Sequence, residues 1–335
     1  KNFLLGQAYL RKSKPELVRK HFSKVSPSSP RYKEALFYLA LLERESGRQS
    51  LFLRYQEELK KDPAYGILIE GVLKERVKRF GVRLGMEYDT NVNISSGDVP
   101  RRKSTRGVAE FYYIHRGESL DYTARLYGNS NSKVPSYDVY RASVDGRYTK
   151  GGIFLPFGLG YTMVGRSYYS TQAYSGLGAY LGELRTSLRV GYEGYRSAPL
   201  EEEKRSAPFG KLEVDGSFQG GDFYSGLYAS AGYYATKGKN WRRAELSVGG
   251  YANKRLGRLG LGISAELTYT PYTQTNTLFG KKRKDTYARL SPFVSYQILP
   301  TTYLLTTYSY NRNASNIGIY DYVRHIFSIS LSHEF

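Results

Sequence analysis

Histidine and serine are the residue types in this chain that could support hydrolysis, because its 335 residues include four histidines and no cysteine. The lack of cysteine excludes a thiol nucleophile, a disulfide and a cysteine-ligated zinc ion. His325 and His333 lie in a serine-containing stretch, and a serine–histidine pair facing lipid could hydrolyse a lipid. No G-x-S-x-G or H-E-x-x-H motif accompanies them. We therefore interpret both residues, and His115, as polar aromatics at a membrane interface. We expect no enzyme, cofactor or metal site, and keep lipid hydrolysis as an alternative.

Charged residues at every second position indicate a different chemistry, the binding or conduction of ions. Over 78–90, Arg79, Arg83 and Glu87 alternate with apolar side chains, which is the period of a β-strand. Long strands with one apolar and one polar face are typical of transmembrane β-barrels, in which the polar face lines the lumen. The predicted pore-lining residues are Arg79, Arg83, Glu87, Arg125, Arg141, Asp145, Arg147, Arg185, Arg189, Glu193, Glu213, Glu266, Arg289 and Arg324. The same face is predicted to hold Asp121, Lys211, Asp215, Arg243, Glu245 and Glu334.

Fourteen segments share this alternation and predict an antiparallel barrel over residues 78–335. The predicted strands are 78–90, 104–115, 120–131, 137–149, 153–165, 168–181, 184–196, 207–218, 223–236, 241–253, 258–271, 284–296, 302–312 and 321–335. The faces of the second and thirteenth strands are ambiguous. Short connections alternate with longer ones, as periplasmic turns alternate with surface loops in bacterial outer-membrane barrels. Closure then requires the last strand to pair with the first, with Arg324 and Glu334 on the lumen face.

The composition agrees with such a barrel. The chain has 34 tyrosines and 35 glycines, a mean hydropathy of −0.52, and no run approaching the roughly 20 apolar residues of a membrane helix. Only every second residue of a barrel strand faces lipid, and tyrosines mark both interfaces. A tyrosine-rich soluble β-sandwich would share this composition, but it would have no reason to alternate short and long connections.

The formal net charge of +20 suggests a partner rich in phosphate. A basic protein often meets nucleic acid, but the basic clusters here fall in predicted surface loops without an ordered stacking platform. Contact with the phosphates of outer-membrane lipids is therefore the favoured interpretation, and solvated loops without a ligand are the alternative. No nucleic-acid partner is expected. The predicted lipid-phosphate contacts are Arg101, Arg102, Lys103, Lys281, Lys282 and Arg283.

Residues 1–77 have a helical period and resemble tetratricopeptide repeats. Two predicted helix pairs are closed by Pro30 and Pro63, 33 residues apart, close to the repeat length of about 34 residues. The apolar positions that carry the resemblance are Leu5, Gly6, Tyr9, Val18, Phe22, Val25, Tyr38, Leu39, Leu42, Leu51 and Tyr55. Asn2 stands where these repeats usually have tryptophan. The resemblance implies a periplasmic domain that binds a protein or peptide client. A generic pair of helical hairpins is the alternative.

Helical repeats followed by a fourteen-stranded barrel resemble the surface lipoprotein assembly modulator family. The stretch Y-D-T-N-V-N over 88–93 resembles the start of that family's barrel, and 311–324 resembles its final hairpin. The family implies a role in moving lipoproteins to the cell surface. The chain also ends on Phe335, as the last strands of outer-membrane barrels usually end on an aromatic residue. That resemblance implies an assembly signal at Phe335.

Two functions follow from these observations. The first is a porin-like outer-membrane channel with a water-filled lumen of mixed charge, weakly anion-selective because basic residues slightly outnumber acidic ones on the predicted inner face. The second is a translocation or assembly factor that moves a lipoprotein or another polymer to the cell surface. The sequence leaves open whether the pore is permanently open or gated.

Overall fold

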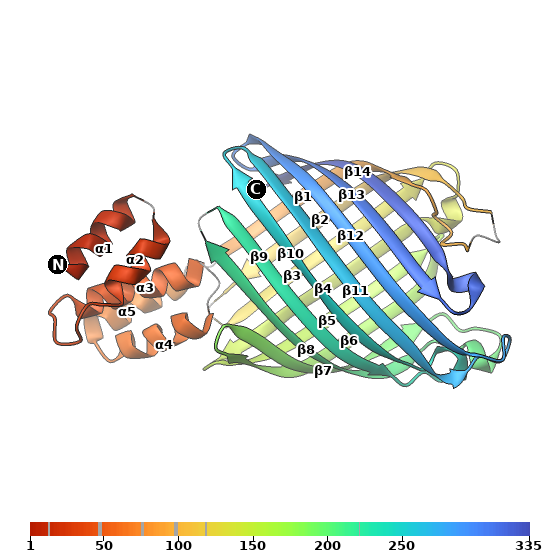
Figure 1. Ribbon diagram of the computed structural model, residues 1–335, viewed down its shortest axis with the longest axis horizontal. Helices are drawn as coiled ribbons and strands as arrows, with labels where there is room; N and C mark the ends of the chain where they lie inside the picture. Colours follow the sequence, from red (N-terminus) through yellow and green to blue (C-terminus); the bar gives the residue numbers. More distant parts are fainter. Residues whose placement is uncertain (13, 46–48, 75–76, 97–99, 118, 221) are drawn as a thin grey trace.

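Five short helices precede the barrel in the computed structural model, which describes residues 1–12, 14–45, 49–74, 77–96, 100–117, 119–220 and 222–335 (Figure 1). The helices are α1 (Asn2–Arg11), α2 (Pro15–Phe22), α3 (Tyr32–Glu45), α4 (Gln49–Lys60) and α5 (Pro63–Lys74). None of the described helices is both long and apolar enough to cross a membrane.

The helices pack around one small apolar core. Val18, Phe22, Leu39, Phe52 and Leu59 are almost completely buried in it. Helix α1 approaches α2 closely, since an added Cβ at Gly6 would lie 2.4 Å from the Phe22 ring. Only glycine leaves room for the ring at this crossing. The core therefore forms from the apolar positions that the helical period selects.

Fourteen antiparallel strands form a closed barrel, which confirms the predicted number of strands and the pairing of the last strand with the first. The strands are β1 (Val77–Asp89), β2 (Ser104–Arg116), β3 (Leu120–Asn131), β4 (Val139–Lys150), β5 (Ile153–Val164), β6 (Ser167–Leu181), β7 (Leu184–Tyr195), β8 (Ala207–Gly220), β9 (Phe223–Tyr234), β10 (Arg243–Leu256), β11 (Leu259–Thr275), β12 (Lys282–Leu299), β13 (Thr302–Ser315) and β14 (Tyr322–Glu334). Strands β11 and β12 extend beyond their predicted ends, to Thr275 and Leu299, and β12 also begins two residues early. Backbone hydrogen bonds of a closed barrel are satisfied without a free edge.

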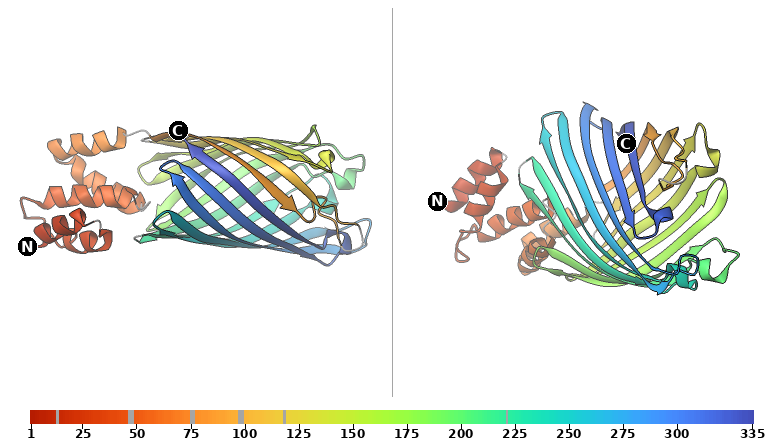
Figure 2. Two further views of the ribbon diagram at one scale, coloured as in Figure 1. Left: turned by 90° about the horizontal axis from the view of Figure 1, so that it is seen from above. Right: turned by 45° about the vertical axis from the view of Figure 1, so that its right-hand side comes forward.

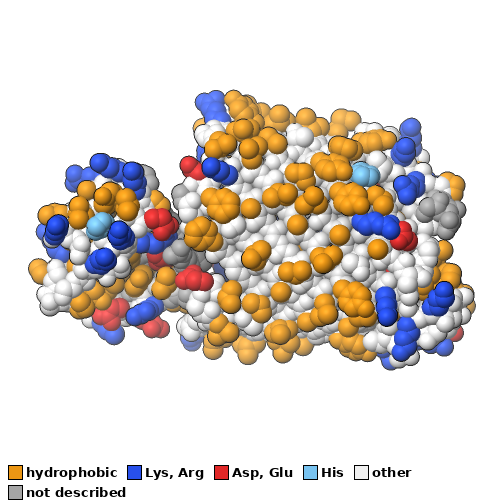
Figure 3. All heavy atoms as spheres, in the orientation of Figure 1, with side chains coloured by type: hydrophobic (Ala, Val, Ile, Leu, Met, Phe, Trp, Pro, Cys, Tyr) orange, Lys and Arg blue, Asp and Glu red, His pale blue; other side chains and the backbone are white. Residues whose placement is uncertain are grey.

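The outer wall is apolar along every strand. Leu84, Leu159, Leu188, Leu227 and Ile329 are each more than half exposed, although they belong to regular strands. Figure 3 shows apolar side chains spread over the whole length of the barrel on the visible face. Because successive side chains of a strand point to opposite faces, the residues between these positions point into the lumen.

Connections at the two ends differ in length. The turns after β2, β4, β6, β8, β10 and β12 are short, with left-handed glycines at Gly151, Gly152, Gly182 and Gly257. At the opposite end, four connections contain a short 3-10 helix, whereas β5 and β6 are joined by Gly165 and Arg166 alone. The helices α1–α5 and the C-terminus lie at the end with the short turns (Figures 1 and 2). The short connections that the sequence predicts therefore lie together at one end of the barrel.

Candidate functional site

Charged side chains line the lumen in cross-strand ion pairs. The pairs are Arg79–Glu334, Arg83–Glu110, Arg125–Glu110, Arg147–Asp121, Arg185–Asp215, Arg189–Glu213, Arg243–Glu193 and Arg289–Glu266. Arg147 Nη2 lies 3.0 Å from Asp121 Oδ2, and Arg185 Nη2 lies 2.9 Å from Asp215 Oδ2. Asp145 instead accepts a hydrogen bond from Tyr174. Arg141 makes no ion pair with another described residue, and borders a small cavity beside Gln172. The predicted lumen positions are thus spread over ladders around the wall rather than gathered in one catalytic pocket.

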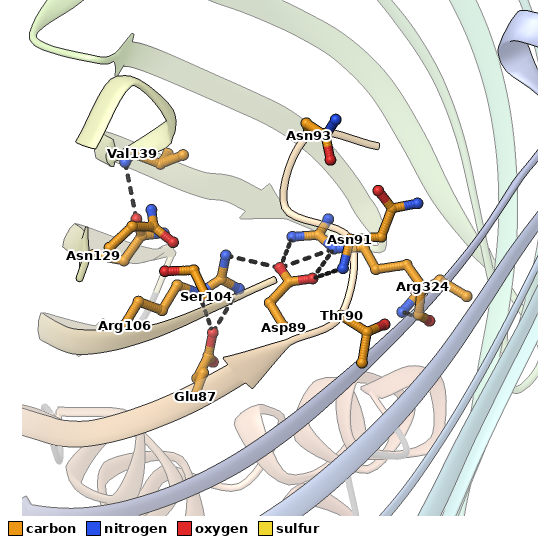
Figure 4. A network of polar contacts seen from close by, with 12 residues as sticks. Glu87, Asp89, Thr90, Asn91, Asn93, Ser104, Arg106, Asn129, Val139 and Arg324 are labelled. Atoms are coloured by element: carbon orange, nitrogen blue, oxygen red, sulfur yellow. Dashed lines mark hydrogen bonds and ion pairs between the residues drawn. The ribbon is translucent and has the colours of Figure 1, made fainter. Parts of the chain in front are cut away.

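A network of polar contacts lies at the loop end of the seam between β1 and β14 (Figure 4). Asp89 is completely buried there and binds two guanidinium groups, those of Arg106 and Arg324. Arg324 Nε lies 3.0 Å from both carboxylate oxygens of Asp89. Arg106 also donates to Glu87 at 2.7 Å. Strands β1, β2 and β14 are therefore joined by side chains as well as by their backbone ladders.

Asn91 extends this network into the loop that follows β1. Its side-chain nitrogen donates to the carbonyl oxygens of Ser95 and Val323, at 2.9 and 3.1 Å. Its side-chain oxygen accepts the backbone N–H of Ser95. The hydroxyl of Thr90 accepts the backbone N–H of His325 at 2.9 Å. The two stretches that carry the family resemblance, 88–93 and 311–324, thus meet at the seam.

Sequence reasoning missed Asp89, Arg106 and Glu110. Asp89 stands at the very end of its strand, and the other two belong to the strand whose face was ambiguous. The register resolves that face, because Val82 opposite Phe111 places Phe111 on the outside and Glu110 inside. The sequence offered one signal: the neighbouring strand β1 alternates clearly, and pairing β2 with it would have identified the inward face of β2.

Inward aromatic rings lie flat against glycines of the adjacent strand. In the described part of the barrel, seven such pairs are direct register partners: Gly81–Tyr112, Gly158–Tyr174, Gly178–Phe154, Gly191–Phe209, Gly226–Tyr251, Gly249–Tyr228 and Gly262–Phe293. A Cβ added to these glycines would lie 2.1 to 2.7 Å from the ring. Each ring therefore occupies the space that a side chain on the neighbouring strand would need, and stays against the wall.

Three solved outer-membrane proteins illustrate what the fold is similar to; no family model and no curated protein matches the chain. OmpT, an outer membrane protein of Vibrio cholerae, is 11 % identical with a TM-score of 0.40, over 78 % of this chain and 98 % of that chain. The anion-selective porin from Comamonas acidovorans is 10 % identical with a TM-score of 0.41, over 78 % and 100 %. The Acinetobacter baumannii outer membrane protein Omp33 is 12 % identical with a TM-score of 0.42, over 77 % and 98 %. These values are too low to transfer a function to this chain.

Arg283 lies away from the surface where it was predicted to meet lipid phosphate. Its side chain is buried at the loop end of the lumen, with Nε 3.0 Å from Asp285 Oδ1 and the guanidinium 3.3 Å from the centre of the Tyr320 ring. The guanidinium of Arg283 also lies over the rings of Trp241 and Tyr272. The early start of β12 turns Arg283 inward. The other five predicted contacts, Arg101, Arg102, Lys103, Lys281 and Lys282, are exposed.

The histidines of β14 lie on the outer face and bind hydroxyl groups. His333 Nδ1 is 2.8 Å from Thr302 Oγ1, and His325 Nδ1 is 2.8 Å from Tyr308 Oη. His115 stacks on Tyr122. Neither hydroxyl partner belongs to a serine, and both sit among aromatic rings. This geometry matches that of aromatic anchors more closely than that of an activated nucleophile.

Proposed function

We propose that this chain is an outer-membrane channel of the porin type, with the helices α1–α5 in the periplasm. The observation that carries the proposal is a closed sheet with an apolar exterior and a charged interior. In water such an exterior would be unfavourable. In a bilayer the apolar side chains contact the lipid, and the polar backbone groups are hydrogen-bonded within the closed sheet. No enzymatic role is part of this proposal.

The orientation follows from the connections. In bacterial barrels the short turns face the periplasm and the long loops face outward. The helices and both ends of the sheet belong to the side with short turns, which supports a periplasmic location for residues 1–77. The exposed Arg101, Arg102, Lys103, Lys281 and Lys282 would then lie near the phosphates of the outer leaflet.

Weak anion selectivity is the second part of the proposal. Most lumen carboxylates are ion-paired with arginine, as in Arg189–Glu213 and Arg289–Glu266, so they attract few free cations. Arg141 has no acidic partner among the described residues. The rings packed on glycines lie against the wall, which favours a water-filled centre of the lumen. A narrow excess of positive charge therefore faces the permeating ions.

Planar-bilayer recording of the purified full chain tests the proposal. We expect steady single-channel conductance and, in a potassium chloride gradient, a reversal potential that shows a modest preference for chloride. Cation preference would overturn the selectivity. A barrel that stays closed at all voltages would overturn the channel.

A translocation or assembly factor is the second candidate. Two features favour it: helical hairpins with the apolar pattern of tetratricopeptide-like repeats sit beside the lumen entrance, and the two stretches resembling the lipoprotein assembly modulators meet in the seam network. Such a factor would handle a lipoprotein or another polymer through residues 1–77. Conductance that appears only when a lipoprotein client is added would favour this candidate over the simple channel.

A further inference from the structure

Two adjoining cavities at the periplasmic end of the lumen share an arginine lining. The inner cavity has a volume of about 330 Å³ and the outer one, at the mouth, about 630 Å³. Arg116, Arg147 and Arg185 line both cavities, so the two spaces adjoin. Leu53 and Lys60 of helix α4 border the outer cavity, and Arg189 borders the inner one.

Positive charge exceeds negative charge in this space. Arg147, Arg185 and Arg189 are balanced by Asp121, Asp215 and Glu213. Arg116 donates only to the backbone carbonyl of His115, at 3.4 Å, and has no acidic partner among the described residues. Lys60 and Lys150 add exposed ammonium groups at the rim. The acidic Glu183 at the outer rim and Asp145 inside, which binds Tyr174, do not offset these cations fully.

Three buried donors around the cavities have no hydrogen-bond partner among the residues that the structure describes. They are Nε of Arg147, Nε of Arg189 and the hydroxyl of Tyr180. A buried donor without an acceptor is unfavourable by about 1–3 kcal/mol, and native proteins leave few of them. Guanidinium groups bind carboxylate and phosphate through paired hydrogen bonds. The excess positive charge of the lining calls for an anion.

We infer that this arginine-lined space is a binding site for a small solute with two or more carboxylate or phosphate groups, occupied as the solute enters or leaves the lumen. The site deepens the proposed channel function and rests on it for its role in transport. Binding itself needs no conduction. Arg116 supplies the unbalanced charge, while Arg147, Arg185 and Arg189 supply hydrogen bonds from side chains already held by their acidic partners.

Isothermal titration calorimetry of the full chain in detergent tests the site, with citrate and pyrophosphate as probes and sucrose as the neutral reference. Arg116→Gln should weaken binding of the better probe by about tenfold, the effect of losing a charge-assisted hydrogen bond. Arg258→Gln is the matched control, since Arg258 is an exposed residue of a periplasmic turn outside both cavities. The double variant Arg185→Gln/Asp215→Asn removes one cavity arginine together with its partner's charge, and should also weaken binding.

Each outcome decides the matter. Binding of citrate alone assigns the site to carboxylates, and binding of pyrophosphate alone assigns it to phosphates. No binding of either probe, or an equal loss in Arg116→Gln and Arg258→Gln, overturns the inference. Blockage of the bilayer current by the bound probe would link the site to permeation. Binding without any conductance would refute the channel and leave the site standing, whereas conductance without binding would do the reverse.

Discussion

Asp89 and Arg324 form an ion pair across 235 residues of sequence, with Arg324 Nε 3.0 Å from both carboxylate oxygens. Asp89 is the last residue of β1, and Arg324 is the third residue of β14. Arg106 of β2 binds the same carboxylate. One fully buried acid thus joins the two strands that close the barrel to their neighbour.

Asp89→Asn should destabilise the closed barrel by about 3 kcal/mol, because removing one partner of a buried ion pair leaves the other charge uncompensated. Arg106 retains Glu87, but Arg324 loses its only acidic partner among the described residues. The measurement is the urea midpoint of barrel unfolding in detergent. Glu183→Gln, in an exposed turn, is the control. Equal midpoints for the two variants would contradict a structural role for the network.

Gly158→Ala should lower single-channel conductance. The added Cβ would lie 2.2 Å from the Tyr174 ring, so the ring must swing into the lumen and give up its hydrogen bond to Asp145. Gly210→Ala is the matched control, since nothing lies within 4 Å of an added Cβ there. Unchanged conductance in Gly158→Ala, with normal folding, would show that the ring does not border the conducting path.

Deletion of Phe335 should impair insertion into the outer membrane far more than it alters the helices. The Phe335 ring packs on Phe80 at 5.8 Å, and its backbone N–H donates to the Phe80 carbonyl at 2.8 Å, yet the residue is 72 % exposed. Its local contribution to the fold is thus small compared with its proposed role as an assembly signal. Fractionation of cells expressing the truncated chain measures the effect. Normal amounts in the outer membrane would refute the signal.

Acid should weaken the helical segment through Glu58. Hydrogen bonds from Lys33 and Lys61 lower the pKa of Glu58 from 4.5 to about 2. A lowered pKa means that the stabilisation is fully present above pH about 4.5 and is lost as pH falls towards about 2. Urea titrations followed by helical circular dichroism should show this trend, and Glu58→Gln should reduce it. Glu57→Gln, at an exposed neighbouring position, should leave the trend intact.

The strands could be predicted because alternation and turn glycines act locally. Inward and outward positions follow from period two, and Gly182 and Gly257 mark tight turns by their left-handed backbone. The inward face of β2 could not be predicted in this way, because Phe111, Tyr112 and Tyr113 are consecutive aromatic residues that fit either face. Its assignment needed the neighbouring strand's register.

The register between neighbouring strands lay beyond sequence reasoning. The pairing of Gly158 with Tyr174 depends on how far β6 is shifted along β5, which one sequence does not specify. Arg283 shows how sensitive such assignments are. It was predicted to lie in a loop, but β12 begins at Lys282 and Arg283 is an inward strand position. Its guanidinium packs on Tyr272 and Tyr320 and does not reach the lipid surface.

The seam between β1 and β14 also sets an order of events during folding. Every other strand pair is a hairpin between neighbours in sequence, whereas pairing of Gly81 with Glu334 requires the two ends of the barrel sequence to meet. Loop-closure entropy makes such a distant contact slow to form. The hairpins can therefore form first, and the Asp89–Arg324 ion pair forms only when the sheet closes into the barrel. This ion pair is then a late contact that marks the completed barrel.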